Sequence, residues 1–444
     1  MKRIITILLI LFFVKVSFAQ ERLREDSLVV YYRQKALNYQ QKVKMAKSHL
    51  TGAEASAEAT KSARLPQLDF NSRYRYFGVP LLQAPSDEPP NVTGDELNNF
   101  YSLNLELYQP ILTGGNLKNS RLAALSEVEM NKSLVGMSEQ EIMLNSDLLY
   151  WRAVAKKEIF AVRKRYKETV GEFQKVINDR VEEEIVGKNE LYQAKVRYND
   201  AEYTVITAEK EFRVSLMDLN RMAGLPVNSV PMIADSLRAI QWNNTNADME
   251  NKALDQRPEI KYFENQISRQ EYNEKVSISR FNPQLGVLAG GKWGSPSPGM
   301  NIEPDFNYYL MAQLKIPIFH WNQKNHEALA SKQLTEVARL QMEEAIDKVK
   351  LEVESSSFQL ERSQSQLDFS RTSLNNARMN VEVMMDRYNE GLSSVLEVLD
   401  AQFDWQKTYM NYVRAKYELN IAYSRFLYAT GQYYQLTGTN DLNN

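Results

Sequence analysis

Three acidic residues stand close together in the stretch GLSSVLEVLDAQFD, residues 391–404. Glu397 and Asp400 are three residues apart, and Asp404 follows one helical turn later. In a helix such positions share one face. Carboxylates at this spacing can act as a general acid and base, hold a metal ion, line a channel, or form an ordinary solvated surface.

The surrounding sequence disfavours the first two kinds of chemistry. An acid–base pair needs a pocket and supporting groups, and helices without long loops supply few. A two-metal site in a helical bundle uses Glu-x-x-His repeats, but the three histidines lie elsewhere, at His49, His320 and His326. Cysteine is absent, which excludes thiolate metal sites and cysteine nucleophiles. We expect no enzyme, no metal and no cofactor.

The charge balance bears on possible partners. The chain carries 54 basic and 56 acidic residues, and no run of lysine and arginine occurs. A nucleic-acid partner would need a basic patch. We therefore expect no nucleic acid as a partner.

The N-terminus, MKRIITILLILFFVKVSFAQ, has the pattern of a secretory signal peptide. Lys2 and Arg3 precede an apolar run, and Ser17 and Ala19 stand at −3 and −1 of a cleavage site. We expect residues 1–19 to be removed. The alternative, a membrane anchor, would need roughly 20 apolar residues. Without cysteine the mature chain has no residue for a lipid anchor.

Long helices are expected to position the acidic residues. Four stretches are rich in helix-forming residues and nearly free of proline, at about 27–64, 116–223, 253–281 and 322–431. Nothing forces a break between Asn116 and about Glu183, so this helix would reach roughly 100 Å. An ordinary globular domain rarely uses such a helix.

Two short segments alternate between apolar and polar residues and predict β-hairpins, at about 66–112 and 283–319. In the first, the alternating apolar residues are Tyr101, Leu103, Leu105 and Leu107. In each segment two strands flank a connection rich in proline, glycine and aspartate. Trp293 and Trp321 bracket the second hairpin, either as anchors at a membrane interface or as packing residues.

The chain repeats itself. Pro110 and Pro317 are 207 residues apart (317 − 110 = 207). The same offset relates further pairs: Ala123 and Ala330, Arg180 and Arg387, Ala194 and Ala401, Ala208 and Ala415, Gly224 and Gly431. We predict an internal duplication, with a first repeat at 20–224, a linker at 225–252, a second repeat at 253–431 and a tail at 432–444.

In their order and spacing, these features resemble the TolC family of outer-membrane efflux and secretion channels. YQPILTGGNLKNSRLAA and LKIPIFHWNQKNHEALA look like the family's strand-to-helix junctions, where Pro110 and Pro317 close a strand. ALDQRPEI, residues 253–260, resembles the start of the family's second repeat. Residues 387–431 resemble its last helical pair, which is the most specific match.

The resemblance implies a mainly α fold with a small β part. Three copies would close a twelve-stranded outer-membrane β-barrel on a periplasmic α-barrel. Such a protein is the passive exit duct of a tripartite efflux or type I secretion system in a Gram-negative cell. Its partners would be a periplasmic adaptor, an inner-membrane RND or ABC pump, and outer-membrane lipid. The alternative is a periplasmic coiled-coil scaffold without a channel.

The resemblance also assigns residues. Glu397 and Asp400 would form the narrowest ring of the trimer, with Asp404 a weaker candidate. At about 6 Å and an effective dielectric near 20, each like-charged pair costs on the order of 3 kcal/mol. We expect Leu396, Leu399 and Phe403 to pack the wall beside them.

The helix turns would carry gating and partner contacts. In the second repeat these are Arg387, Tyr388, Gly391, Leu392 and Ser393. Tyr388 could instead be an ordinary packing residue. In the first repeat the adaptor-contacting residues would be Glu184, Ile185, Val186 and Gly187, in a turn whose geometry the sequence leaves open.

Overall fold

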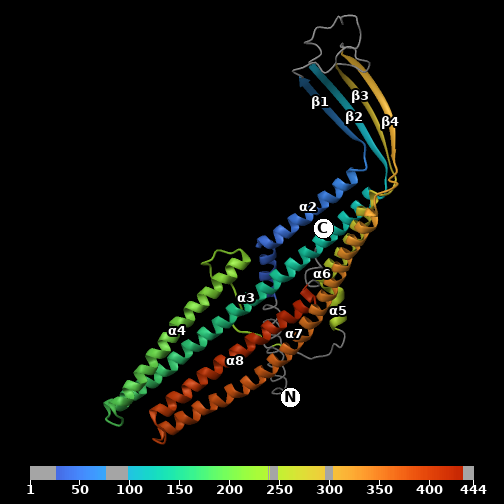
Figure 1. Ribbon diagram of the computed structural model, residues 1–444. Coiled ribbons are helices and arrows are strands. Elements are labelled where there is room, and N and C mark those ends of the chain that lie inside the picture. The colour runs from blue at the N-terminus through green and yellow to red at the C-terminus, as the bar shows by residue number, and fades with distance from the viewer. Residues whose placement is uncertain (1–26, 77–98, 239, 241–248, 296–303, 434–444) are drawn as a thin grey trace, which may run out of the picture. The chain divides into compact units, whose positions relative to one another are not determined.

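The computed structural model describes residues 27–76, 99–238, 240, 249–295 and 304–433. The expected signal peptide and most of the predicted tail lie outside these residues. A helical segment over 27–39 comes first. The remaining elements are α2 (Gln41–Ser62), β1 (Gln67–Tyr76), β2 (Asn99–Thr113), α3 (Asn116–Glu182), α4 (Lys188–Ala223), α5 (Met249–Gln256), α6 (Pro258–Ser279), β3 (Gln284–Ser295), β4 (Asp305–Lys315), α7 (Gln323–Asn389) and α8 (Val395–Ala429). The fold is thus mainly helical with four strands (Figure 1). Among the described helices, none has both the length and the hydropathy to cross a bilayer.

The chain forms two compact units, and neither unit coincides with a sequence repeat. Of the described residues, the first unit combines those within 27–46, 134–260 and 345–433, and the second combines those within 47–133 and 261–344. Each unit therefore draws on both predicted repeats. The physical reason is that elements of the two repeats pair with each other, as β2 pairs with β3. The repeats describe the chain's sequence, and the units describe how it packs.

The duplication is visible in the backbone. Helices α3 and α7 both have 67 residues, and their ends are displaced by 207. The described residues with positive φ fall into pairs with that same offset: Gly114 and Trp321, Gly115 and Asn322, Glu184 and Gly391, Gly224 and Gly431. Positive φ marks a turn that needs a left-handed residue. The two copies therefore turn at equivalent positions.

The sequence offset between the two repeats is larger at the first strand of each hairpin. Gln67 begins β1 and Gln284 begins β3, a displacement of 217 (284 − 67 = 217). The stretch from the start of β1 to Gly114 is thus ten residues longer than the stretch from the start of β3 to Trp321 (217 − 207 = 10). The connection between β1 and β2, residues 77–98, lies outside the described part of the chain.

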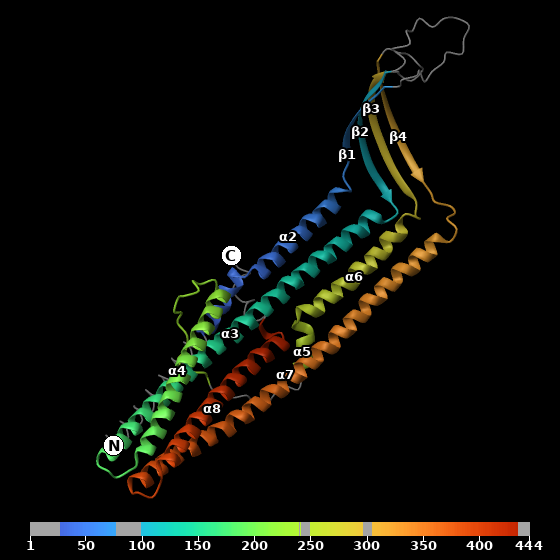
Figure 2. The ribbon, with the colours of Figure 1, turned by 60° about the vertical axis from the view of Figure 1, so that its left-hand side comes forward.

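The second unit contains one antiparallel sheet in the order β1-β2-β3-β4. Figure 2 shows the four strands side by side. Leu103, Leu105 and Leu107 lie on one face of β2 and remain exposed, as do Tyr308 and Leu310 on β4. The predicted alternation is present, and no second layer of described residues covers this apolar face.

Pro110 lies inside a strand, which the sequence did not predict. Strand β2 continues to Thr113, and its pairing with β3 shifts between Pro110 and Leu112. Proline has no N–H for the ladder, so an irregularity here is expected. Pro317 follows the end of β4 at Lys315, as predicted for a residue that closes a strand.

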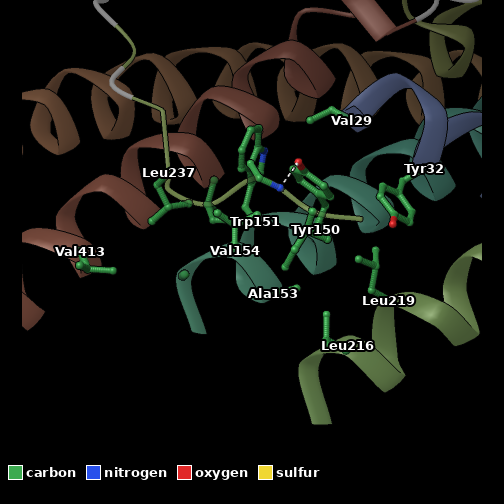
Figure 3. Close-up of a cluster of buried hydrophobic side chains, with 14 of the residues drawn as sticks. Val29, Tyr32, Tyr150, Trp151, Ala153, Val154, Leu216, Leu219, Leu237 and Val413 are labelled. Atoms are coloured by element: carbon green, nitrogen blue, oxygen red, sulfur yellow. Dashed lines mark hydrogen bonds between the residues drawn. The ribbon is translucent and has the colours of Figure 1, made fainter. Parts of the chain in front are cut away.

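The first unit is held by a core of large side chains (Figure 3). Tyr150 and Trp151 of α3 are fully buried there. Ile233 and Leu237 belong to the same cluster, so the linker packs into the core. The backbone N–H of Ala234 donates a hydrogen bond to the Tyr150 hydroxyl at 3.3 Å.

A buried carboxylate fastens both ends of the described chain to α3. Asp147 is 1% exposed and accepts two hydrogen bonds from the Arg33 guanidinium, at 2.7 and 2.6 Å. It also accepts hydrogen bonds from the hydroxyls of Tyr433 at 2.5 Å and Ser424 at 3.1 Å. Burial, and then the Asp147 charge, raise the pKa of Tyr433 well above its ordinary value.

Candidate functional site

Two helix turns carry most of the residues assigned from the sequence, and both belong to the first unit. One joins α3 to α4 and the other joins α7 to α8 (Figures 1 and 2). In the second, the N–H of Leu392 donates to the Arg387 carbonyl at 2.7 Å, and the N–H of Gly391 donates to the Tyr388 carbonyl. This is the Schellman pattern at a helix C-terminus.

The first turn repeats this pattern with a different residue at its left-handed position. The N–H of Ile185 donates to the Arg180 carbonyl at 2.9 Å. Glu184 has φ 59°, whereas Gly391 has φ 74°. Gly187 has φ −76° and is the N-cap of α4. The nearby glycine does not make the turn, and the 207-residue offset is the sequence signal that identifies Glu184 instead.

The two helices that leave the turns begin differently. Ser394 caps α8 in a capping box: its Oγ accepts from the Glu397 N–H at 3.3 Å, and its own N–H donates to Glu397 Oε2 at 2.7 Å. The Ser394 hydroxyl also donates to Glu397 Oε2, at 3.0 Å, and the hydrogen bonds from the Ser394 backbone and then from this hydroxyl lower the pKa of the Glu397 carboxyl. Gly187 gives α4 no side-chain cap.

Within one chain the predicted packing stripe on α8 is buried only in part. Leu399 is 1% exposed, but Leu396 is 49% and Phe403 is 39% exposed. The face of α8 that is buried within the chain carries Val395, Val398, Leu399, Ala401, Gln402 and Gln406. Sequence reasoning missed this face because two of its buried positions are glutamines.

Tyr388 is a packing residue in this structure. Its ring centroid lies 5.1 Å from that of Phe173. The Arg180 guanidinium stands over the ring at 4.3 Å and donates to the Tyr388 carbonyl at 3.3 Å. Burial raises the pKa of the phenol, and its hydroxyl has no hydrogen-bond partner among the described residues. The geometry matches the packing alternative left open by the sequence.

The other residues of the second turn lie at its surface. Arg387 occupies the place of Arg180 in the duplicated frame and donates to the Leu392 carbonyl at 3.3 Å. Gly391 and Leu392 are exposed. Ser393 is half-buried and contacts the Met384 sulfur at 3.7 Å.

The three carboxylates of α8 have different surroundings. Glu397 is held in its capping box. Asp400 forms an ion pair with Arg197 of α4, with 2.9 Å between Oδ1 and Nη2. Asp404 is exposed and has no ion pair among the described residues. Sequence reasoning did not identify Arg197, because no local motif marks it.

A shallow groove runs between α4 and α8 beside this ion pair. Its lining comprises Asn189, Tyr192, Gln193, Val196, Arg197, Asp200, Leu396 and Leu399. Tyr192, Val196 and Leu396 are exposed there. Within the described ranges, no three histidine or acidic side chains gather closely enough to hold a metal ion. The arrangement offers apolar and charged contacts to a partner or a solute.

Comparison with known proteins identifies relatives. Residues 250–432 match the family described as "Outer membrane efflux protein". The chain is 20% identical to outer membrane efflux protein BepC of Brucella suis over 332 residues, covering 74% of this chain and 72% of BepC. It is 23% identical to the pyoverdine export outer membrane protein OpmQ of Pseudomonas aeruginosa over 199 residues, covering 44% of this chain and 41% of OpmQ.

Solved structures share the fold. The outer membrane channel CmeC of Campylobacter jejuni aligns with a TM-score of 0.77 at 18% identity, covering 91% of this chain and 85% of CmeC. The outer membrane protein VceC of Vibrio cholerae aligns with a TM-score of 0.77 at 14% identity, covering 92% and 97%. The second repeat thus matches the outer membrane efflux protein family, and the described chain has the fold of solved outer membrane channels.

Proposed function

We propose that this protein is the outer-membrane exit duct of a tripartite efflux or type I secretion system. It would passively conduct small molecules or proteins from the periplasm to the exterior. The observation that carries the proposal is the four-stranded sheet, which has exposed apolar residues on one face and no neighbouring strand at β1 or β4 within the described chain. The match of residues 250–432 to the outer membrane efflux protein family supports the same role.

Three copies of the chain would complete the duct. A sheet edge in lipid leaves backbone N–H and C=O groups without partners, and each such group costs several kcal/mol. Closure through β1 of one copy and β4 of the next removes both edges. Twelve strands would then form the barrel, and the apolar face that carries Leu103 and Leu105 would meet outer-membrane lipid.

The helix turns are the proposed periplasmic end of the duct. Glu184 and Ile185 of the first turn and Leu392 of the second are exposed, which suits contact with a periplasmic adaptor. An inner-membrane RND or ABC pump would supply the energy. Glu397, Asp400 and Asp404, near the start of α8, are the proposed constriction.

Cell fractionation and reconstitution test this proposal. We expect a heat-modifiable trimer in the outer-membrane fraction and discrete conductance steps when purified protein enters planar bilayers. A soluble periplasmic monomer without conductance would instead indicate the coiled-coil scaffold. The relative OpmQ, described as a pyoverdine exporter, suggests a small-molecule cargo as the first to test.

A further inference from the structure

The three carboxylates at the start of α8 do not contribute equally to the local charge. Glu397 faces its own helix N-terminus, where two hydrogen bonds and the helix dipole compensate it. Asp400 has a cationic partner at 2.9 Å, and Asp404 has none among the described residues. The difference lies in what α4 places opposite each residue.

Arg197 is held in position from two sides. Its guanidinium lies 5.3 Å from the Phe403 ring centroid, close enough for a cation–π contact, and it binds the Asp400 carboxylate. Its side chain is 26% exposed, whereas that of Asp400 is 58% exposed. Arg197 thus covers the side of Phe403 and Asp400 that faces α4.

The duplication shows that this arrangement is asymmetric. Position 197 in the first repeat corresponds to position 404 in the second (404 − 207 = 197), so an arginine stands where the other copy has Asp404. Position 193 corresponds to position 400, and Gln193 replaces the acid there. At these two pairs of positions the first repeat therefore contributes one positive charge, and the second repeat contributes two negative charges.

An ion pair this exposed contributes little to stability. Its effect on the electric field is larger. Beyond a few ångströms a close pair of opposite charges acts as a dipole, whereas the field of an unpaired carboxylate extends over a Debye length of about 8 Å. Asp200 and Arg163 also lie near Tyr166 in this region and offset one another in charge.

We propose that Arg197 sets the fixed charge of the duct's periplasmic mouth. It cancels Asp400 within each protomer and leaves Asp404 as the carboxylate that gives the duct a preference for cations. This inference rests on the proposed function. It assigns ion preference to a residue of the first repeat and to Asp404, rather than to Glu397 and Asp400.

Reversal potentials of single channels in a KCl gradient test the inference. Arg197→Gln should raise the cation-to-anion permeability ratio at least two- to threefold, because one unit charge at about 7 Å in water changes the local ion concentration by about that factor and each of the three copies loses one charge. Asp400→Asn should lower the ratio by a similar factor, because it leaves Arg197 unpaired. The double variant Arg197→Gln/Asp400→Asn should return to the wild-type ratio.

Asp404→Asn tests whether the carboxylate without an ion-pair partner acts on the permeating ions. It should lower the ratio at least as much as Asp400→Asn does. Arg213→Gln is the matched control, since Arg213 lies on α4 but pairs with Glu209 of its own helix at 2.7 Å. It should leave the reversal potential unchanged, and every variant should first be shown to form the wild-type oligomer.

The outcomes distinguish failure of the proposed function from failure of the inference about Arg197. Wild-type protein that inserts no channels would contradict the proposed function. Wild-type channels with an unchanged reversal potential in Arg197→Gln or Asp404→Asn would overturn the inference alone. So would a double variant that fails to return to the wild-type ratio.

Discussion

At the residue scale, the left-handed positions of the two turns show how one backbone serves two sequences. Gly391 and Glu184 occupy equivalent places and make equivalent hydrogen bonds. A side chain in this conformation costs roughly 1–2 kcal/mol relative to the right-handed region. The first turn therefore bears a backbone strain that the second turn avoids.

Exchanging the residue types should reverse this difference. A Cβ at Gly391 would meet nothing within 4 Å, so Gly391→Ala should destabilise its turn by about 1 kcal/mol through backbone conformation alone. Glu184→Gly should stabilise the other turn slightly. Hydrogen exchange at the amides of Leu392 and Ile185 measures both effects. Gly52→Ala, within α2 and equally uncrowded, is the control and should be stabilising. Faster exchange in Glu184→Gly would contradict the strain argument.

The buried group of Asp147, Arg33, Ser424 and Tyr433, called the Asp147 cluster, supplies a second prediction. Asp147→Asn leaves the buried Arg33 guanidinium without its counter-charge, and breaking such a pair costs about 3–5 kcal/mol. The midpoint of thermal unfolding should fall clearly in detergent solution. Glu129→Gln, which breaks an exposed pair with Lys132 on α3, should change the midpoint very little. Equal shifts in the two variants would show that the cluster is not a special source of stability.

Buried tyrosines predict sensitivity to alkali. Burial raises the pKa of Tyr32 and of Tyr428 to about 12. A raised pKa favours the protonated folded form, so its contribution is complete below pH 10 and is lost as the pH rises from 10 through 12. Unfolding should therefore begin above pH 10. Absorbance of tyrosinate should show these phenols titrating after the exposed ones, and a single early titration of all tyrosines would contradict the burial.

At the element scale, the duplicated helices differ most where they begin. Helix α8 has a complete capping box, while α4 has glutamate at the same third position but glycine at its N-cap. N-cap serine is typically worth about 1 kcal/mol relative to alanine but only about a few tenths of a kcal/mol relative to glycine. The first turn of α4 should therefore open more readily than that of α8.

Restoring the cap tests this difference between elements. Gly187→Ser should complete a capping box with Glu190 and slow hydrogen exchange in the first turn of α4. The new Cβ would approach only the flexible end of Asn189. Ser394→Ala should do the opposite in α8. Because the pKa of Glu397 is lowered, the α8 cap should persist above the ordinary glutamate pKa and weaken as pH falls through the lowered value. Unchanged exchange in both variants would refute the capping argument.

Much of the element pattern follows from local sequence. The unbroken run from Asn116 predicted α3 almost to its end, and alternation predicted β2 and β4. Three features that depend on tertiary contacts could not be predicted from local sequence. They are the burial of Gln402 and Gln406, the ion pair of Arg197, and the continuation of β2 past Pro110. Each of these depends on which element lies opposite, and periodicity within one element does not encode that.

At the scale of the whole molecule, the two repeats exchange elements to build their compact units. The β2–β3 ladder crosses from one repeat to the other, and the first unit mixes helices of both. Neither repeat would keep its packing partners if expressed alone. The edge strands β1 and β4 likewise need partners from outside their own repeat. In the proposed barrel these partners are strands of another copy of the chain.

Cysteine cross-linking can test this pairing cleanly, because the chain has no native cysteine. Asn71→Cys on β1 would be combined in turn with Asn307→Cys, Met311→Cys or Gln313→Cys on β4. All four positions lie on the face of the sheet opposite Leu103, Leu105 and Leu107. Oxidation should produce dimer and trimer bands for one pair or two neighbouring pairs, since antiparallel register brings only those cysteines together. Asn104→Cys with Lys292→Cys is the control: these residues are directly paired within one chain, so oxidation should leave a monomer. Monomer bands for every β1–β4 pair would exclude closure through these edges, even if the protein still formed channels.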